Sequence, residues 1–69
     1  MKNYLIVVEK TDTGYSAYSA DIDGCIATGA TKEEIHVNIH EAIEFHLEGL
    51  KLEGIDIPEP QSYVEYHQI

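Results

Sequence analysis

The stretch Asp21-Ile-Asp-Gly-Cys-Ile-Ala-Thr-Gly-Ala-Thr-Lys-Glu-Glu34 contains a turn, a short strand and the start of a helix. Gly24 and Gly29 stand at its two bends, where the absence of a Cβ gives the backbone conformations that other residues resist. The small, partly β-branched run between the two glycines favours a strand. Thr31, with Glu34 three residues later, has the spacing of a helix-capping box. The stretch therefore predicts a strand that passes directly into a helix.

Two further strands are predicted on the N-terminal side of this stretch. Tyr4–Glu9 is apolar on both faces, which is typical of a central strand. The loop Thr11–Gly14 predicts a hairpin that leads into a second strand, Tyr15–Ala20. With a third strand over Cys25–Ala30, the short loops indicate an antiparallel meander.

A helix and a fourth strand are predicted on the C-terminal side. The helix is expected over Lys32–Glu53, because Gly54 stops it and two prolines follow. Tyr63–Tyr66 is then a fourth strand. The right-handed crossover rule places it parallel to the third strand or to the first, which runs in the same direction, and the central character of the first strand favours a place beside that one. The apolar positions of the helix share one face, which we expect to lie on the sheet: Ile35, Ile39, Ala42, Ile43, His46, Leu47 and Leu50. The predicted fold class is α+β, with the order βββαβ in a single domain spanning residues 1–69.

The length of 69 residues limits how the fold is stabilised. A chain of this size buries only about 60% of its unfolded surface. Its single cysteine excludes an intramolecular disulfide, and no zinc-finger spacing is present. We therefore expect a homo-oligomer, a dimer or higher. There is no signal-peptide pattern and no apolar run of membrane-spanning length, which predicts a cytoplasmic protein with no membrane partner.

The charge balance restricts the partners. Thirteen acidic residues face four lysines, there is no arginine, and the formal net charge is −9. Nucleic-acid affinity depends on Lys and Arg contacts to phosphates, so direct binding of DNA or RNA is not expected. A basic protein is the complementary partner, because opposite potentials speed association and exclude wrong partners.

The sequence resembles the HicB family of antitoxins over about residues 2–66. The matching positions are Asp21-Ile22, Gly24-Cys25, Gly29, Thr31, Glu33-Glu34, Glu41-Ala42-Ile43 and the tail Ile57-Pro-Glu-Pro60. Asp23 stands where the family usually has proline. The resemblance implies a partial ribonuclease-H-like fold and an antitoxin that masks a small basic HicA-like toxin, an mRNA-cleaving protein. Many family members continue into a DNA-binding domain, and no separate DNA-binding domain is expected in residues 1–69.

The outer side of the helix is the predicted partner-binding surface. Glu34, Glu41 and Glu48 recur every seven residues, and Phe45 and Leu52 lie among them, away from the predicted core face. An acidic row with an exposed aromatic residue is more typical of an interface than of a solvated face. The alternative is that Phe45 is an isolated exposed side chain or is covered by the tail.

His36 and His40 are weak candidates for metal ligands. They lie four residues apart on the helix, and Glu33 and Glu44 are close to the same side, so together they could ligate zinc or nickel. A HEXXH-type site requires Glu directly after the first histidine, where this chain has Val37. A solvated flank of the helix is the favoured interpretation, and we predict no metal and no cofactor.

No catalytic set can be assembled from the sequence. Cys25 has no basic neighbour to activate it, and the loop residues Asp12, Asp21 and Asp23 are expected to shape turns. His46 falls in the apolar stripe and is interpreted as a packing residue. We therefore expect a binding protein rather than an enzyme. The alternative to the antitoxin function is a stand-alone oligomeric scaffold or small-ligand module with no toxin partner.

Overall fold

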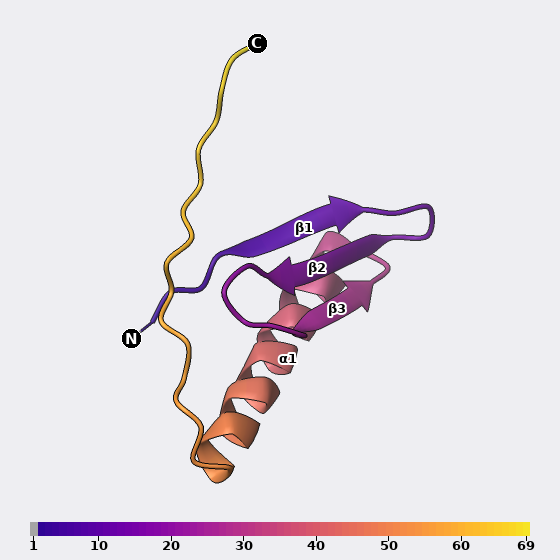
Figure 1. Cartoon of the computed structure of the whole chain (residues 1–69). Coiled ribbons are helices and arrows are strands. Elements are labelled where there is room, and N and C mark those ends of the chain that lie inside the picture. The colour runs from indigo at the N-terminus through magenta and orange to yellow at the C-terminus, as the bar shows by residue number, and fades with distance from the viewer. Residues whose placement is uncertain (1) are drawn as a thin grey trace.

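The computed structural model describes residues 2–69 as three antiparallel strands on one long helix, followed by an extended C-terminal segment (Figure 1). The elements are β1 (Ile6–Lys10), β2 (Tyr15–Ser19), β3 (Ile26–Gly29) and α1 (Lys32–Leu52). The sheet has the order β1-β2-β3. The predicted α+β class is confirmed, and the boundaries of these four elements differ from the expected ones by at most two residues.

The start of α1 follows from its cap. Thr31 has extended backbone angles, and its hydroxyl oxygen accepts a hydrogen bond from the Glu34 N–H at 3.1 Å. The Glu34 carboxylate in turn accepts from the Ala30 N–H at 2.9 Å. The predicted capping arrangement is confirmed, although the carboxylate reaches one residue further back than in the usual box. The Glu34 carboxylate is thereby engaged in starting the helix.

The end of α1 is a Schellman motif. Gly54 has a φ of +73°, and its N–H donates to the Lys51 carbonyl oxygen at 3.1 Å. The Ile55 N–H donates to the Leu50 carbonyl oxygen at 2.9 Å. These two bonds satisfy carbonyl groups that the last turn leaves free and reverse the direction of the chain. Along residues 2–69, α1 lacks the length of apolar sequence that a membrane crossing requires.

The core lies between α1 and the inner face of the sheet. Its buried hydrophobic residues are Ala17, Ile22, Cys25, Ile35 and Ile39, and Tyr4, Ile6, Tyr15, Ala27, Ala42, Ile43 and Leu47 pack against them. The helix lies against β2 and β3 and makes no comparably close approach to β1. One side of the sheet therefore extends beyond the helix.

Gly24 and Gly29, the two glycines between Asp21 and Glu34, have different physical roles. Gly24 has a φ of +76° in the turn before β3, which glycine adopts at little cost. Gly29 has no positive φ; instead, a Cβ at this position would stand 2.7 Å from the Ile35 backbone nitrogen. The close contact between the end of β3 and the first turn of α1 therefore requires the missing side chain of Gly29.

The predicted fourth strand is absent from residues 2–69, and the predicted central place of β1 is wrong. Residues 63–66 are extended but pair with no strand, so β1 is an edge strand and β2 is central. The reason is the anchoring of the tail. The Asp21 carboxylate accepts hydrogen bonds from the Gln61 N–H and the Ser62 N–H, both at 3.1 Å, and from the Ser62 hydroxyl at 2.9 Å. These contacts hold the tail at the turn between β2 and β3 instead of along β1.

Candidate functional site

The outer side of α1 is open to solvent. Phe45 is 82% exposed and Leu52 is 83% exposed, so the tail covers neither of them. Glu41 and Glu48 are exposed on the same helix, seven residues apart. Glu34 belongs to the same row, but its carboxylate is hydrogen-bonded to the backbone of Ala30. The outer helix face, which we define as Glu41, Phe45, Glu48 and Leu52, thus presents two carboxylates with two large apolar groups.

The uncovered face of the sheet carries an apolar row that the sequence analysis did not identify. The register aligns Val7 with Tyr18 and Tyr18 with Ile26, so the three residues lie side by side across the strands. Tyr18 and Ile26 are exposed. The three residues belong to three different strands, so only the register shows that they form one row.

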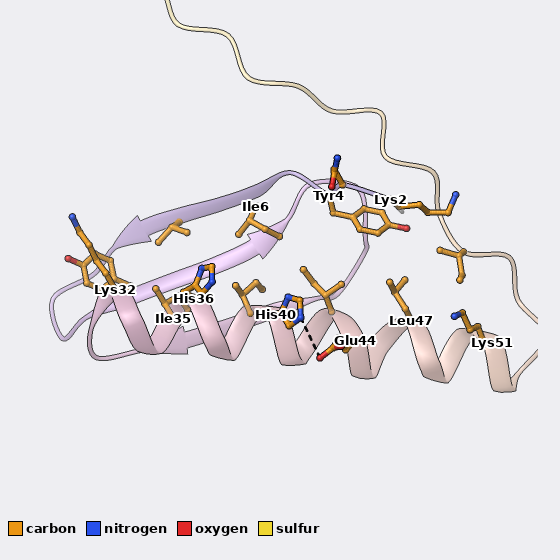
Figure 2. Close-up of a pocket in the computed structure, with 16 residues that line it drawn as sticks. Lys2, Tyr4, Ile6, Lys32, Ile35, His36, His40, Glu44, Leu47 and Lys51 are labelled. Atoms are coloured by element: carbon orange, nitrogen blue, oxygen red, sulfur yellow. Dashed lines mark ion pairs between the residues drawn. The ribbon is translucent and has the colours of Figure 1, made fainter.

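A groove lies between β1 and α1, where the sheet extends beyond the helix. Its volume is about 1030 Å³. Ile6 and Val8 of β1 line one wall and Ile39, Ile43 and Leu47 of α1 line the other. We call this feature the β1 groove, and Figure 2 shows the two walls with side chains directed between them.

The β1 groove gathers most of the positive charge of the chain. Three of the four lysines line it, namely Lys2, Lys32 and Lys51. Lys32 lies near the start of α1 and Lys51 near its end, so they mark opposite ends of the groove (Figure 2). The sequence analysis missed this cluster because the three lysines are far apart in the chain. Glu44 also lines the groove and Lys2 is paired with Glu59, so the positive charge there that no ion pair of the described residues compensates is that of Lys32 and Lys51.

The two candidate metal ligands belong to the wall of this groove. His36 and His40 line it, and the His40 Nε2 lies 3.6 Å from a Glu44 carboxylate oxygen (Figure 2). Across residues 2–69, no three His, Cys, Asp or Glu side chains lie close enough together to hold a metal ion. The histidines and their neighbouring carboxylates do not form the ligand set that the sequence analysis considered.

Cys25 and the loop aspartates have structural positions. Cys25 is only 4% exposed, and burial raises the pKa of its thiol. The hydrogen bond from the Ser62 N–H lowers the pKa of Asp21, with smaller contributions from the Ser62 hydroxyl and the Gln61 N–H. Burial thus disfavours the thiolate that a nucleophilic Cys25 would need, and Asp21 anchors the tail. The expectation that Cys25 is a packing residue is confirmed.

Comparisons with known proteins cover nearly the whole chain. A family model described as the HicB-like antitoxin of bacterial toxin–antitoxin systems matches residues 4–68. A UPF0150 protein of Synechocystis is 39% identical over 64 residues, covering 91% of this chain and 81% of its own. An uncharacterised 14.9 kDa protein of Haemophilus phage HP1 is 35% identical over 63 residues, covering 91% of this chain. The present chain spans 47% of the length of that phage protein.

A solved structure shares the fold. A chain of the HicA3 and HicB3 toxin–antitoxin complex is 37% identical, with a TM-score of 0.70, over 84% of this chain and 72% of its own. The match in fold agrees with the match of the family model over residues 4–68. The chain therefore belongs to the HicB-like antitoxin family of bacterial toxin–antitoxin systems.

Proposed function

We propose that this chain binds a small basic HicA-like toxin in the cytoplasm and masks the cationic surface with which that toxin holds mRNA. The observation that carries the proposal is the outer helix face, where Glu41 and Glu48 flank an 82% exposed Phe45. An exposed aromatic group surrounded by carboxylates is complementary to a cationic surface with an apolar pocket. The similarity to a chain of the HicA3 and HicB3 complex supports a toxin as the partner.

The proposed mechanism is binding without chemistry. Covering the toxin's basic surface with carboxylates removes the charges that attract RNA phosphates. Phe45 and Leu52 would lose their solvent-exposed surface in the complex, and burial of aromatic groups dominates the energy of many interfaces. No catalytic step is assigned to this chain, and burial disfavours the Cys25 thiolate that a nucleophilic mechanism would need.

The test is a pair of double variants with the toxin encoded beside this chain. Phe45→Ala with Glu41→Lys alters the outer helix face, and we expect its toxin affinity to fall at least about tenfold, a loss of roughly 1.4 kcal/mol. Co-expression should then fail to rescue growth. Affinity is measured by calorimetry and growth by plating, with circular dichroism confirming that both variants fold.

The matched control alters the other exposed apolar surface. Tyr18→Ala with Ile26→Ala removes two exposed apolar groups from the uncovered sheet face and should leave toxin affinity unchanged. The reverse result, with loss only in the sheet variant, would assign toxin binding to the sheet. If neither variant weakens binding, the proposed surface is wrong.

A second candidate function is a stand-alone oligomeric scaffold or small-ligand module. The observation that favours it is the β1 groove, whose apolar walls and lysine rim lie away from the outer helix face. Co-expression separates the two functions. If the neighbouring basic protein neither co-purifies with this chain nor is neutralised by it, the antitoxin proposal fails and the scaffold is favoured.

A further inference from the structure

One edge of β1 has backbone groups that pair with no other strand of the described residues. Within residues 2–69, β1 pairs with β2 on one side, and no strand lies on its other side. The backbone groups along that edge are a template for another strand. The edge is five residues long, Ile6–Lys10, with a single lysine at its end. One exposed lysine is a weak safeguard against pairing, so the edge is suited to receive a strand.

The β1 groove lies directly below this edge and has the shape to receive the side chains of an added strand. Its walls are apolar, and Val8 is half-exposed although it points into the groove. In a strand, alternate side chains point to the same face, so an added strand would direct every second side chain into the groove. Lys2 is already paired with Glu59, but Lys32 and Lys51 at the two ends of the groove favour an occupant that carries negative charge.

The C-terminal tail of the chain has the properties that this edge requires. We define the tail as residues 63–69, which are extended and exposed along their whole length. Tyr63 is 80% exposed and Tyr66 is 92% exposed, with Val64 between them. Glu65 supplies negative charge. With Ile69, the tail has four exposed large apolar side chains in seven extended residues, which is the composition of a strand that has no partner.

The tail does not reach the edge of its own chain. Hydrogen bonds hold Gln61 and Ser62 on Asp21, and the Tyr4 hydroxyl donates to the Pro58 carbonyl oxygen. Lys2 and Glu59 form an ion pair of 2.6 Å. Beyond Ser62 the tail runs away from the sheet, as Figure 1 shows in yellow. The anchor therefore holds the tail outward, where a second molecule can receive it.

We propose that two copies of this chain exchange their tails, so that residues 63–69 of each copy add a strand to the free edge of β1 in the other. Every second side chain of the incoming strand enters the β1 groove, so Tyr63, Glu65, His67 and Ile69 share its face and Glu65 is directed toward the lysine at one end of the groove. The exchange gives hydrogen-bond partners to the backbone groups of the free edge and of the tail in both copies. Such a reciprocal contact closes on itself as a two-fold dimer. The outer helix face takes no part in it, so the dimer keeps two separate surfaces for toxin.

The test uses the full chain in solution. Light scattering should give twice the monomer mass of 7.8 kDa. Every second amide of residues 63–69 should exchange slowly with solvent, because alternate N–H groups of an added strand donate to the edge of β1. In a mixture of isotope-labelled and unlabelled chains, nuclear Overhauser contacts should join Tyr63 or Ile69 of one copy to Ile6 or Val8 of the other.

Other results would overturn the exchange. A monomer with rapidly exchanging tail amides leaves the edge free. A dimer with unprotected tail amides places the contact elsewhere, and tail contacts within a single copy show that the strand is added in the same chain. If a strand of the toxin binds at the edge instead, the tail amides stay unprotected from hydrogen exchange. The amides of β1 then become protected only when toxin is added.

Proline variants provide a second measurement. Adjacent N–H groups of a strand point to opposite edges, so one of Val64→Pro and Glu65→Pro removes an amide donor to β1, and the dimer dissociation constant of that variant should rise at least about tenfold. The matched control is Asp56→Pro, because Asp56 is exposed and its N–H makes none of the described hydrogen bonds. The control should keep the dimer, and all three variants should keep the circular dichroism of α1. A dissociation constant that is unchanged in both Val64→Pro and Glu65→Pro contradicts the proposal. Toxin binding by each variant is measured separately, so failure of the exchange is distinguishable from failure of the antitoxin function.

Discussion

At the scale of single residues, the contact between β3 and α1 is the most restrictive feature of the fold. A Cβ on Gly29 would lie 2.7 Å from the Ile35 nitrogen and 3.0 Å from its Cα, and both are backbone atoms of the first helical turn. Backbone atoms cannot move aside as a flexible side chain can. Gly49, in the last turn of α1, is the opposite case, because a Cβ there would meet nothing within 4 Å.

We therefore predict opposite effects for the same substitution at these two glycines. Gly29→Ala should destabilise the protein by about 1–3 kcal/mol, because the strand and the helix must separate. Gly49→Ala should stabilise it by about 0.5–1 kcal/mol, because alanine has the better helix propensity. Urea unfolding followed by circular dichroism measures both. Equal effects at the two positions would contradict the argument from close approach.

At the scale of elements, the sequence was sufficient where the signals were local. The cap at Thr31, the stop at Gly54 and the turn at Gly24 each depend on residues within a few positions, and each is present in the structure. The apolar stripe of α1 was also predicted correctly for Ile35 and Ile39, because it depends only on helical periodicity.

The tail could not be predicted in the same way. Tyr63–Tyr66 has the composition of a strand, but its pairing is decided by hydrogen bonds between Ser62 and Asp21, forty-one residues apart. The β1 groove escaped prediction for a related reason, since it depends on how far the sheet extends beyond α1. Composition and periodicity contain no information on such distant contacts.

The anchor of the tail gives a prediction on pH. Hydrogen bonds from Ser62 and Gln61 lower the pKa of Asp21 in the attached state, so attachment is complete above the ordinary aspartate pKa of about 3.9. As the pH falls through the lowered pKa, the carboxylate is protonated and the stabilisation is lost. The amides of Gln61 and Ser62, followed by nitrogen relaxation, should therefore become mobile only at pH values below that ordinary pKa.

The control for this prediction is Asp21→Asn. Asparagine keeps one acceptor oxygen but has no charge, so attachment should be weaker at neutral pH and should not change as the pH is lowered through this range. If the wild-type amides become mobile well above pH 4, or if the variant keeps the same pH dependence, another group controls the tail.

At the scale of the whole molecule, charge is unevenly distributed. The net charge is −9, yet three of the four lysines lie in one groove, so the remaining surface is more acidic than the total suggests. The outer helix face, which we propose as the toxin surface, belongs to this acidic part. Charge of this kind chiefly accelerates association and has less effect on dissociation.

The association rate constant with a basic toxin should therefore fall about tenfold or more as salt is raised from low concentration to roughly 0.5 M. Stopped-flow mixing measures it. Glu41→Lys should lower the rate at low salt more than Asp12→Lys does, although both change the net charge equally, because Asp12 lies in the hairpin loop after β1. Equal rates for the two variants would show that only the total charge matters.

The joining of the chain's two ends has a consequence for the order of folding. The sheet and helix are made from contacts of short sequence separation, which form quickly. The contacts of the tail span much longer loops: Lys2 with Glu59 is 57 residues apart, and Tyr4 with Pro58 is 54. Pro58 and Glu59 leave the ribosome after the strands and the helix. A nascent molecule can therefore form its sheet and helix before the tail is attached to Lys2 and Tyr4. The last step of folding is then the attachment of Pro58 and Glu59 to the N-terminal residues Tyr4 and Lys2. Only after this step is the tail held in the position from which it can pair with a second molecule.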